Sequence, residues 1–126
     1  MKGALIGCGF FAQNHLHAWH DIPEVEIVAL CDSDDENLNS TAQSFNIGRT
    51  YSNAEALFND GGFDFVDIAT TVGSHRFLVE MAAKAGVHII CQKPLAPTYA
   101  ESLALSNAIK ASNVRMMVHE NFRFQP

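Results

Sequence analysis

The feature that most constrains this chain is a glycine-rich turn that follows its first apolar segment. Residues 2–6 predict a short strand, and they run directly into the stretch Gly7-Cys8-Gly9-Phe10-Phe11-Ala12. Gly7 allows a tight turn, Gly9 lets the backbone approach a phosphate group closely, and Ala12 lets the following helix pack against the strand. The N-terminus of that helix offers unpaired N–H groups and a partial positive charge to an anion. The pattern predicts a site for the pyrophosphate of a dinucleotide, contacted by Gly7, Gly9, Phe10 and Phe11; the alternative is an ordinary strand-to-helix turn.

An acidic residue ends the second predicted strand, at the position where such a site needs one. Residues 25–31 are rich in β-branched and apolar side chains, and Asp32 follows them, 23 residues after Gly9. That spacing is typical of a carboxylate that accepts hydrogen bonds from the adenosine ribose. The alternative is a helix cap, because further acidic residues follow. Residues 33–36 contain no Arg or Lys, so the 2′-phosphate of NADP would meet only negative charge, and we expect NAD rather than NADP.

The composition is typical of one globular domain. The chain has 126 residues, of which 48% are apolar, enough for a substantial core. The net charge of −6 and the scarcity of basic residues argue against binding to nucleic acid or to an anionic membrane surface. Neither a signal peptide nor an apolar run long enough to cross a membrane is visible in the sequence. We therefore expect a cytoplasmic protein.

The cysteines and histidines do not have the spacing of a metal site. Cys8, Cys31 and Cys91 lie in the glycine loop or at the ends of predicted strands, and we expect reduced thiols that pack in the interior rather than a disulfide or a metal cluster. In the histidine-rich stretch 15–20, only His17 and His20 can share a helix face, and no neighbouring carboxylate or cysteine completes a ligand set. We expect these histidines to be solvated and predict no metal.

Strand and helix patterns alternate along the chain. Hydrophobic periodicity and turn residues predict strands at 2–6, 25–31, 49–51, 65–69, 87–91 and 114–118, and helices at 10–21, 34–46, 53–59, 74–85 and 98–112. We expect Ser52 to cap the third helix, and Thr98 and Glu101 to form a capping box on the fifth. The inward face of the fourth helix is predicted to hold Phe77, Leu78, Met81, Ala82 and Ala85. This alternation predicts an α/β fold, a doubly wound parallel sheet of the Rossmann type in three α/β/α layers, with ligands at the carboxyl ends of the strands.

Polar residues follow the fourth and fifth predicted strands, where such ligands bind. Thr70, Thr71 and Ser74 are small hydroxyl residues that we expect to line the cofactor site, and Ser74 can also cap the next helix. For His75, contact with the cofactor and exposure to solvent in the first helical turn are open alternatives. Lys93 is held in an extended conformation by the proline that follows it. This favours a role beside the nicotinamide and the substrate, although most lysines are simply solvated at the surface.

Together these residues resemble the glucose–fructose oxidoreductase / inositol dehydrogenase / MocA family of NAD(P)-dependent oxidoreductases. The resemblance rests on the glycine loop, on Asp32, on the turn at 70–75, and on two stretches, Ala-Gly-Val-His-Ile-Ile-Cys-Gln-Lys-Pro-Leu-Ala at 85–96 and Asn-Phe-Arg-Phe at 121–124. It implies hydride transfer between nicotinamide and a sugar, polyol or related hydroxy compound. Lys93 would be the catalytic residue that helps to position the nicotinamide ribose and the substrate and assists proton transfer. The resemblance also implies cofactor contacts from His75, Gln92, Lys93 and Asn121, and substrate contacts from Lys93 and Arg123.

Two features depart from the family pattern. The motif is usually Glu-Lys-Pro, and Gln92 keeps the hydrogen-bonding shape of that glutamate but not its charge. The resemblance also implies a second α/β domain, which would supply most substrate contacts and the surface for a homo-oligomer. We therefore expect residues 1–120 to form the dinucleotide-binding domain and 121–126 to start the crossover to a C-terminal α/β substrate domain. A non-catalytic NAD-binding redox sensor or regulatory module is the alternative to an enzyme.

Overall fold

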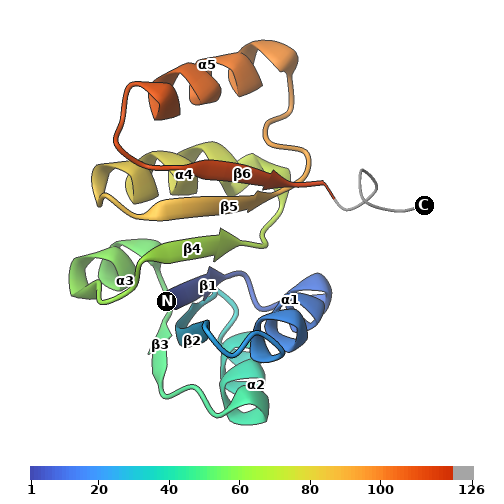
Figure 1. Ribbon diagram of the computed structural model, residues 1–126. Helices are drawn as coiled ribbons and strands as arrows, with labels where there is room; N and C mark the ends of the chain where they lie inside the picture. Colours follow the sequence, from blue (N-terminus) through green and yellow to red (C-terminus); the bar gives the residue numbers. More distant parts are fainter. Residues whose placement is uncertain (121–126) are drawn as a thin grey trace.

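The structure, a computed structural model, describes residues 1–120 and has one six-stranded sheet. All strand pairs are parallel, in the order β3-β2-β1-β4-β5-β6 (Figure 1). The strands are β1 (Lys2–Ile6), β2 (Glu26–Cys31), β3 (Arg49–Tyr51), β4 (Phe65–Ile68), β5 (His88–Gln92) and β6 (Met116–His119). The helices are α1 (Phe10–His20), α2 (Asp35–Phe45), α3 (Ala54–Asp60), α4 (His75–Lys84) and α5 (Tyr99–Lys110), with a 3-10 turn η1 (Val72–Ser74) before α4.

Helices cover the sheet in two separate layers, so the predicted three-layer, doubly wound architecture is confirmed. Helices α1 and α2 pack on one face, over Leu5 of β1 and Leu30 of β2. Helices α3, α4 and α5 pack on the other face, over Val66 of β4 and Ile89 of β5. These side chains are buried almost completely, and each stabilises the fold by about 1.5–3 kcal/mol on burial. The parallel arrangement brings the carboxyl ends of all strands to one edge of the sheet.

Helix caps explain where the helices begin. The capping box predicted for α5 is confirmed in part: Glu101 N–H donates to Thr98 Oγ1 at 3.2 Å, but the Glu101 carboxylate accepts from the Thr98 hydroxyl at 3.0 Å in place of the Thr98 backbone N–H. The predicted cap of α3 is wrong by one residue: Asn53, not Ser52, accepts from the Ala56 N–H at 2.9 Å. Helix α2 is capped by Asp34, which leaves the carboxylate of Asp32 outside this role.

The inward face predicted for α4 is partly wrong. Leu78 and Ala82 are buried as expected, whereas Phe77 is 57% exposed and Ala85 is exposed. Val79 is fully buried instead. The helix begins one residue later than predicted, after the 3-10 turn.

His15 is also buried, which contradicts the expectation of solvated histidines. Its Nδ1 lies 2.9 Å from Oδ2 of Asp67 in β4, and the indole N–H of Trp19 donates to the same oxygen at 2.8 Å. His15 is 8% exposed and Asp67 1% exposed. His17 and His20 are exposed, as expected. The partner of His15 lies 52 residues away along the chain, so the spacing of residues within α1 could not indicate it.

Candidate cofactor-binding site

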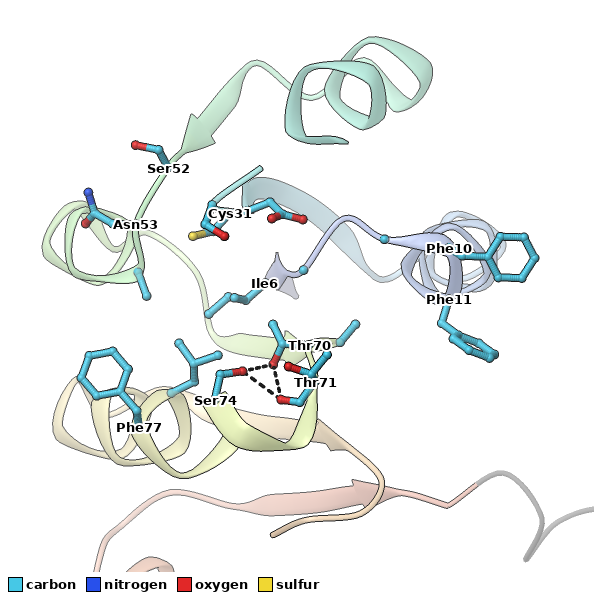
Figure 2. A pocket seen from close by; sticks show the side chains of 17 residues that line it. Ile6, Phe10, Phe11, Cys31, Ser52, Asn53, Thr70, Thr71, Ser74 and Phe77 are labelled. Atoms are coloured by element: carbon cyan, nitrogen blue, oxygen red, sulfur yellow. Dashed lines mark hydrogen bonds between the residues drawn. The ribbon is translucent and has the colours of Figure 1, made fainter. Parts of the chain in front are cut away.

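A cavity of about 680 Å³ lies at the carboxyl ends of β1, β2, β3 and β4 (Figure 2). Eight residues that were predicted to bind the cofactor line it: Gly7, Gly9, Phe10, Phe11, Asp32, Thr70, Thr71 and Ser74. Among the described lining residues, Asp32 carries the only formal charge. A 2′-phosphate on the ribose would therefore meet a carboxylate and no lining cation, which is unfavourable for NADP.

The two glycines of the first loop serve different purposes. Gly7 has a φ of +97°, and a Cβ there would lie 2.7 Å from the carbonyl oxygen of Ala69. The loop is held in this turn by the Gly7 N–H, which donates to the Cys31 carbonyl at 2.8 Å. A Cβ on Gly9 would meet no protein atom within 4 Å, so Gly9 faces open space at the cavity. The structure thus has the tight turn and the bare backbone that a pyrophosphate requires.

The start of α1 offers backbone N–H donors to an anion, as the predicted pyrophosphate site requires. Gly9 is the N-cap, and no side chain caps the helix there. The first N–H groups of a helix have no partner within the helix, and they favour an anion. Ala12 is 1% exposed and packs against the sheet, as its small size predicts.

Asp32 joins the glycine loop to the end of β2. The Cys8 N–H donates to its Oδ2 at 2.7 Å, and the Asp34 N–H donates to its Oδ1 at 2.9 Å. A carboxylate has about four acceptor positions, so each oxygen can still accept from a ribose hydroxyl. The helix-cap alternative for Asp32 is wrong, and its lining of the cavity fits the predicted ribose site.

The turn after β4 is organised by hydroxyl groups. Ser74 Oγ lies 2.6 Å from Thr70 Oγ1 and 3.0 Å from the Thr71 carbonyl oxygen, and Figure 2 shows these contacts at the cavity wall. Ser74 occupies the N-cap position of α4, but its side chain caps no N–H there. The predicted side-chain cap is therefore wrong, and the hydroxyl instead holds the turn that lines the cavity.

His75 connects this turn to the loop after β5. Its Nε2 lies 3.0 Å from the Thr70 carbonyl oxygen, and its Nδ1 lies 2.9 Å from the Pro94 carbonyl oxygen. The side chain is fully buried, at 0% exposure, so the solvent-exposed alternative is wrong. It does not line the cavity, and its predicted contact with the cofactor stays a prediction. The geometry gives His75 the role of a link between two loops at the strand ends.

Gln92 and Lys93 lie at the end of β5, next to this link and outside the lining of the cavity. Lys93 is exposed, and its backbone N–H donates to Oε1 of Gln92 at 2.8 Å. A glutamate could accept the same bond, so Gln92 preserves this contact without the charge. The Lys93–Pro94 peptide bond is cis. The predicted roles of Asn121 and Arg123 lie outside the described residues.

Sequence reasoning missed one end of the cavity. Ser33, Ser52, Asn53 and Phe77 also line it. Ser52 and Asn53 directly follow β3, and the rule that ligands bind beyond strand ends could have included them. Phe77 gave no such signal, because helical spacing placed it among core residues.

The three thiols near the strand ends are free and buried. Burial raises the pKa of Cys8 and of Cys91 to about 12 and that of Cys31 to about 11, and nearby carboxylates add to each shift. These groups are therefore protonated at neutral pH, which disfavours them as nucleophiles. Within residues 1–120, no cluster of three potential metal ligands is present. No helix in the same range is long and apolar enough to cross a membrane.

Comparison with known proteins finds similar dehydrogenases and oxidoreductases, some of them solved with NAD+ or NADH. The D-apiose dehydrogenase of Paraburkholderia graminis is 59% identical over 125 residues, which cover 99% of this chain and 33% of the relative. An oxidoreductase from Agrobacterium radiobacter was solved with NAD+, L-tartaric acid and magnesium, and it matches this structure with a TM-score of 0.97 at 54% identity. The match covers 99% of this chain and 36% of the solved chain. Levoglucosan dehydrogenase, solved with NADH and levoglucosan, matches with a TM-score of 0.89 at 32% identity. That match covers 98% of this chain and 35% of the solved chain.

The chain thus spans about a third of the length of these relatives. The model of the oxidoreductase family with an NAD-binding Rossmann fold, GFO_IDH_MocA, matches residues 1–120. This confirms the resemblance that the glycine loop, Asp32 and the Lys93 stretch indicate, and it agrees with NAD as the cofactor. The chain belongs to the GFO_IDH_MocA family of oxidoreductases and comprises its NAD-binding Rossmann domain.

Proposed function

We propose that the protein is an NAD-dependent dehydrogenase that transfers hydride between nicotinamide and a sugar, polyol or related hydroxy compound. The observation that carries this proposal is the position of Lys93 relative to the cavity. Strand β5, which Lys93 follows, pairs with β4, and the turn after β4 lines the cavity. The ring nitrogens of His75 lie 2.9 Å and 3.0 Å from carbonyl oxygens of the two loops, Pro94 and Thr70. Lys93 therefore directly follows the strand that pairs with β4, which supports our proposal that its ammonium reaches a substrate hydroxyl.

The proposed chemistry separates the work of the cofactor from that of the chain. Bound NAD supplies the ring that accepts hydride from the carbinol carbon of the substrate. The chain has to hold the hydroxyl and assist the loss of its proton. In our proposal the ammonium of Lys93 donates a hydrogen bond to the hydroxyl oxygen and stabilises the negative charge that develops there as the hydroxyl proton passes to solvent water. Gln92 holds the backbone of Lys93 through the bond from its N–H.

The relatives indicate the first substrate to test. At 59% identity, the D-apiose dehydrogenase of Paraburkholderia graminis supports an aldose, with D-apiose as the leading candidate. Because this chain spans a third of that relative, we propose that a C-terminal α/β domain, entered through residues 121–126, supplies most substrate contacts. We further propose a cytoplasmic homo-oligomer; the free cysteines fit a reducing compartment.

The test compares Lys93→Ala with the wild-type protein in its full length, with Lys110→Ala as the control. Lys110 is an exposed lysine at the end of α5, away from the cavity. We expect Lys93→Ala to lower kcat with D-apiose and NAD+ by about 10²- to 10⁴-fold, while NADH affinity, measured by fluorescence, changes by less than about threefold. The control should match the wild type.

Two outcomes would contradict the proposal. Unchanged kcat in Lys93→Ala would remove Lys93 from the reaction. NADH binding by the wild type without turnover of D-apiose or other sugars and polyols would favour a regulatory NAD-binding module. Gln92 is the residue that points to this alternative, because it leaves the motif without a carboxylate.

A further inference from the structure

His75 is a buried histidine whose two ring nitrogens both face backbone carbonyl oxygens. Nε2 lies 3.0 Å from the Thr70 carbonyl oxygen, while Nδ1 lies 2.9 Å from that of Pro94 and 3.3 Å from that of Leu95. The residue is 0% exposed. Within residues 1–120, no carboxylate forms an ion pair with the ring. The partners of both ring nitrogens are therefore groups that only accept hydrogen bonds.

This arrangement determines how many protons the ring must carry. A neutral imidazole has one N–H donor and one nitrogen that accepts, so it could donate to only one side and would turn a lone pair toward the other carbonyl group. With a proton on each nitrogen, the ring donates to both sides. The start of α4 disfavours the positive charge that results, but hydrogen bonds from a charged donor are stronger than this effect of the helix terminus. The geometry thus favours a ring that donates from both nitrogens.

The carbonyl groups on the two sides of the ring belong to loops with different functions. Thr70 lies in the turn after β4, which lines the cofactor cavity. The other side is the loop 93–95 after β5, which begins with Lys93. Strands β4 and β5 are paired, but the ladder between them ends before either loop begins. Beyond the ladder, the contacts of His75 join the turn at the cavity to the loop that carries Lys93.

The backbone of Lys93 is held on both sides, although its side chain is exposed. Before it, Gln92 accepts the Lys93 N–H at 2.8 Å. After it, Leu95 packs against the core and Ala96 is 7% exposed within it. The ring of His75 connects this fixed segment to the wall of the cavity. The position of Lys93 relative to the cavity therefore depends on the link through His75.

We propose that His75 is a positioning residue for Lys93, which donates from both ring nitrogens and sets the distance between the Lys93 loop and the cofactor cavity. In this role the ring acts through the loop rather than through a contact with substrate or cofactor. The inference rests on the proposed function, in which Lys93 meets the substrate hydroxyl. A break at either end of the link should therefore disturb the reaction as much as a break at both ends.

Three substitutions of His75 in the full-length protein break the link at different ends. In His75→Gln the amide nitrogen takes the place of Nε2 and can still donate to the turn after β4. In His75→Asn it takes the place of Nδ1 and can still donate to the loop after β5. His75→Phe keeps an aromatic ring and breaks both ends. The control is His20→Gln, since His20 is exposed at the end of α1 and lies outside the cavity.

All three variants should lower kcat with D-apiose and NAD+ by about 10- to 100-fold, to levels within about threefold of one another. NADH affinity should stay within about threefold of the wild type. The urea midpoint should fall further in His75→Phe than in the other two, because both buried carbonyl groups then lose their donor. A purely structural role would instead make kcat follow the urea midpoint. Wild-type kcat in either His75→Gln or His75→Asn would overturn the proposal.

A double variant tests whether His75 acts through Lys93. Residues that act as a unit have non-additive effects. In the Lys93→Ala background, His75→Gln should therefore change the residual kcat by less than about threefold. A further loss as large as that of His75→Gln alone would overturn the proposal.

Nuclear magnetic resonance of the full-length protein with isotope-labelled histidine measures the protons on the ring. The His75 signals are those that disappear in His75→Gln, and both ring nitrogens should have the chemical shift of a protonated nitrogen at the pH of the assay. A nitrogen without a proton would overturn the two-sided link. A wild-type protein that binds NADH but turns over no sugar or polyol would instead overturn the proposed function, and the signals would still decide whether the ring donates to both loops.

Discussion

The backbone N–H of Cys8 donates a hydrogen bond of 2.7 Å to the carboxylate of Asp32. Cys8 lies between the two glycines of the loop after β1, and Asp32 directly follows the neighbouring strand β2. One carboxylate therefore fixes the shape of the loop and also faces the cavity where the ribose is expected. Removal of the Asp32 carboxylate should therefore weaken cofactor binding in two ways, through the loop and through the ribose.

Asp32→Ala should weaken NADH binding by about 10- to 100-fold, because hydrogen bonds to a charged group and the tie to the loop are lost together. Asp32→Asn keeps one acceptor oxygen and should lose less. Removal of the charge should also reduce the preference for NADH over NADPH, since the 2′-phosphate no longer meets a carboxylate. Fluorescence titration with both cofactors measures this, with the exposed Asp35→Asn as the control. An unchanged preference in Asp32→Ala would contradict the ribose assignment.

The two glycines of the loop should respond differently to the same substitution. In Gly7→Ala, the positive φ and the 2.7 Å approach of the new Cβ to the Ala69 oxygen should lower the free energy of unfolding by at least about 1–3 kcal/mol. In Gly9→Ala, the Cβ meets open space, so stability should stay within about 0.5 kcal/mol. Urea unfolding measures both.

Gly9→Ala should nevertheless bind NADH at least about tenfold more weakly, because its methyl group occupies the space of the pyrophosphate. Each variant thus serves as the control for the other. Wild-type NADH affinity in Gly9→Ala would show that the pyrophosphate lies elsewhere.

Local patterns in the sequence predicted the elements well, and eight of the residues predicted to bind the cofactor line the cavity. The observed boundaries lie at most two residues from the predicted ones, since turn residues and caps act within a few residues. Ser52 and Asn53 show the limit of such patterns, because both can cap a helix and only the backbone decides which one does. His15 and Phe77 show a second limit. His15 is buried and contacts Asp67 of β4, and Phe77 is exposed in the wall of the cavity. Both outcomes depend on residues distant in the sequence.

The contact between His15 and Asp67 should be important for stability. Oδ2 of Asp67 is the acceptor for both His15 and Trp19, and its carboxylate is buried. Asp67→Ala leaves the buried His15 and the half-buried Trp19 without this partner and should lower the free energy of unfolding by about 3–5 kcal/mol. Asp67→Asn keeps an oxygen for them and should cost about 1–2 kcal/mol.

Trp19→Phe provides the matched measurement, because it removes one of the two hydrogen bonds and keeps most of the ring packing against Phe65. We expect a loss of about 1 kcal/mol in urea unfolding. Equal stability of Asp67→Ala and the wild type would show that the buried carboxylate is not what holds α1 against β4.

The buried thiols predict a dependence of stability on pH in the alkaline range. Burial raises the pKa of Cys91 from 9.0 to about 12 in the folded protein, whereas the unfolded thiol titrates at its ordinary pKa. Below pH 9 both states hold the proton, and the thiol causes no change in stability with pH. Between pH 9 and 12 the unfolded state loses the proton first, so the free energy of unfolding falls as pH rises.

Tyrosines and lysines also titrate in this range, so the informative quantity is the difference between wild type and Cys91→Ala. The urea midpoint of the variant should fall less between pH 8 and pH 10.5 than that of the wild type. At pH 8, the native thiols should react with a disulfide reagent far more slowly than free cysteine does, and all three should react at once in urea, because the thiolate is the reactive form. Native thiols that react as fast as free cysteine would contradict the raised pKa values and the burial that causes them.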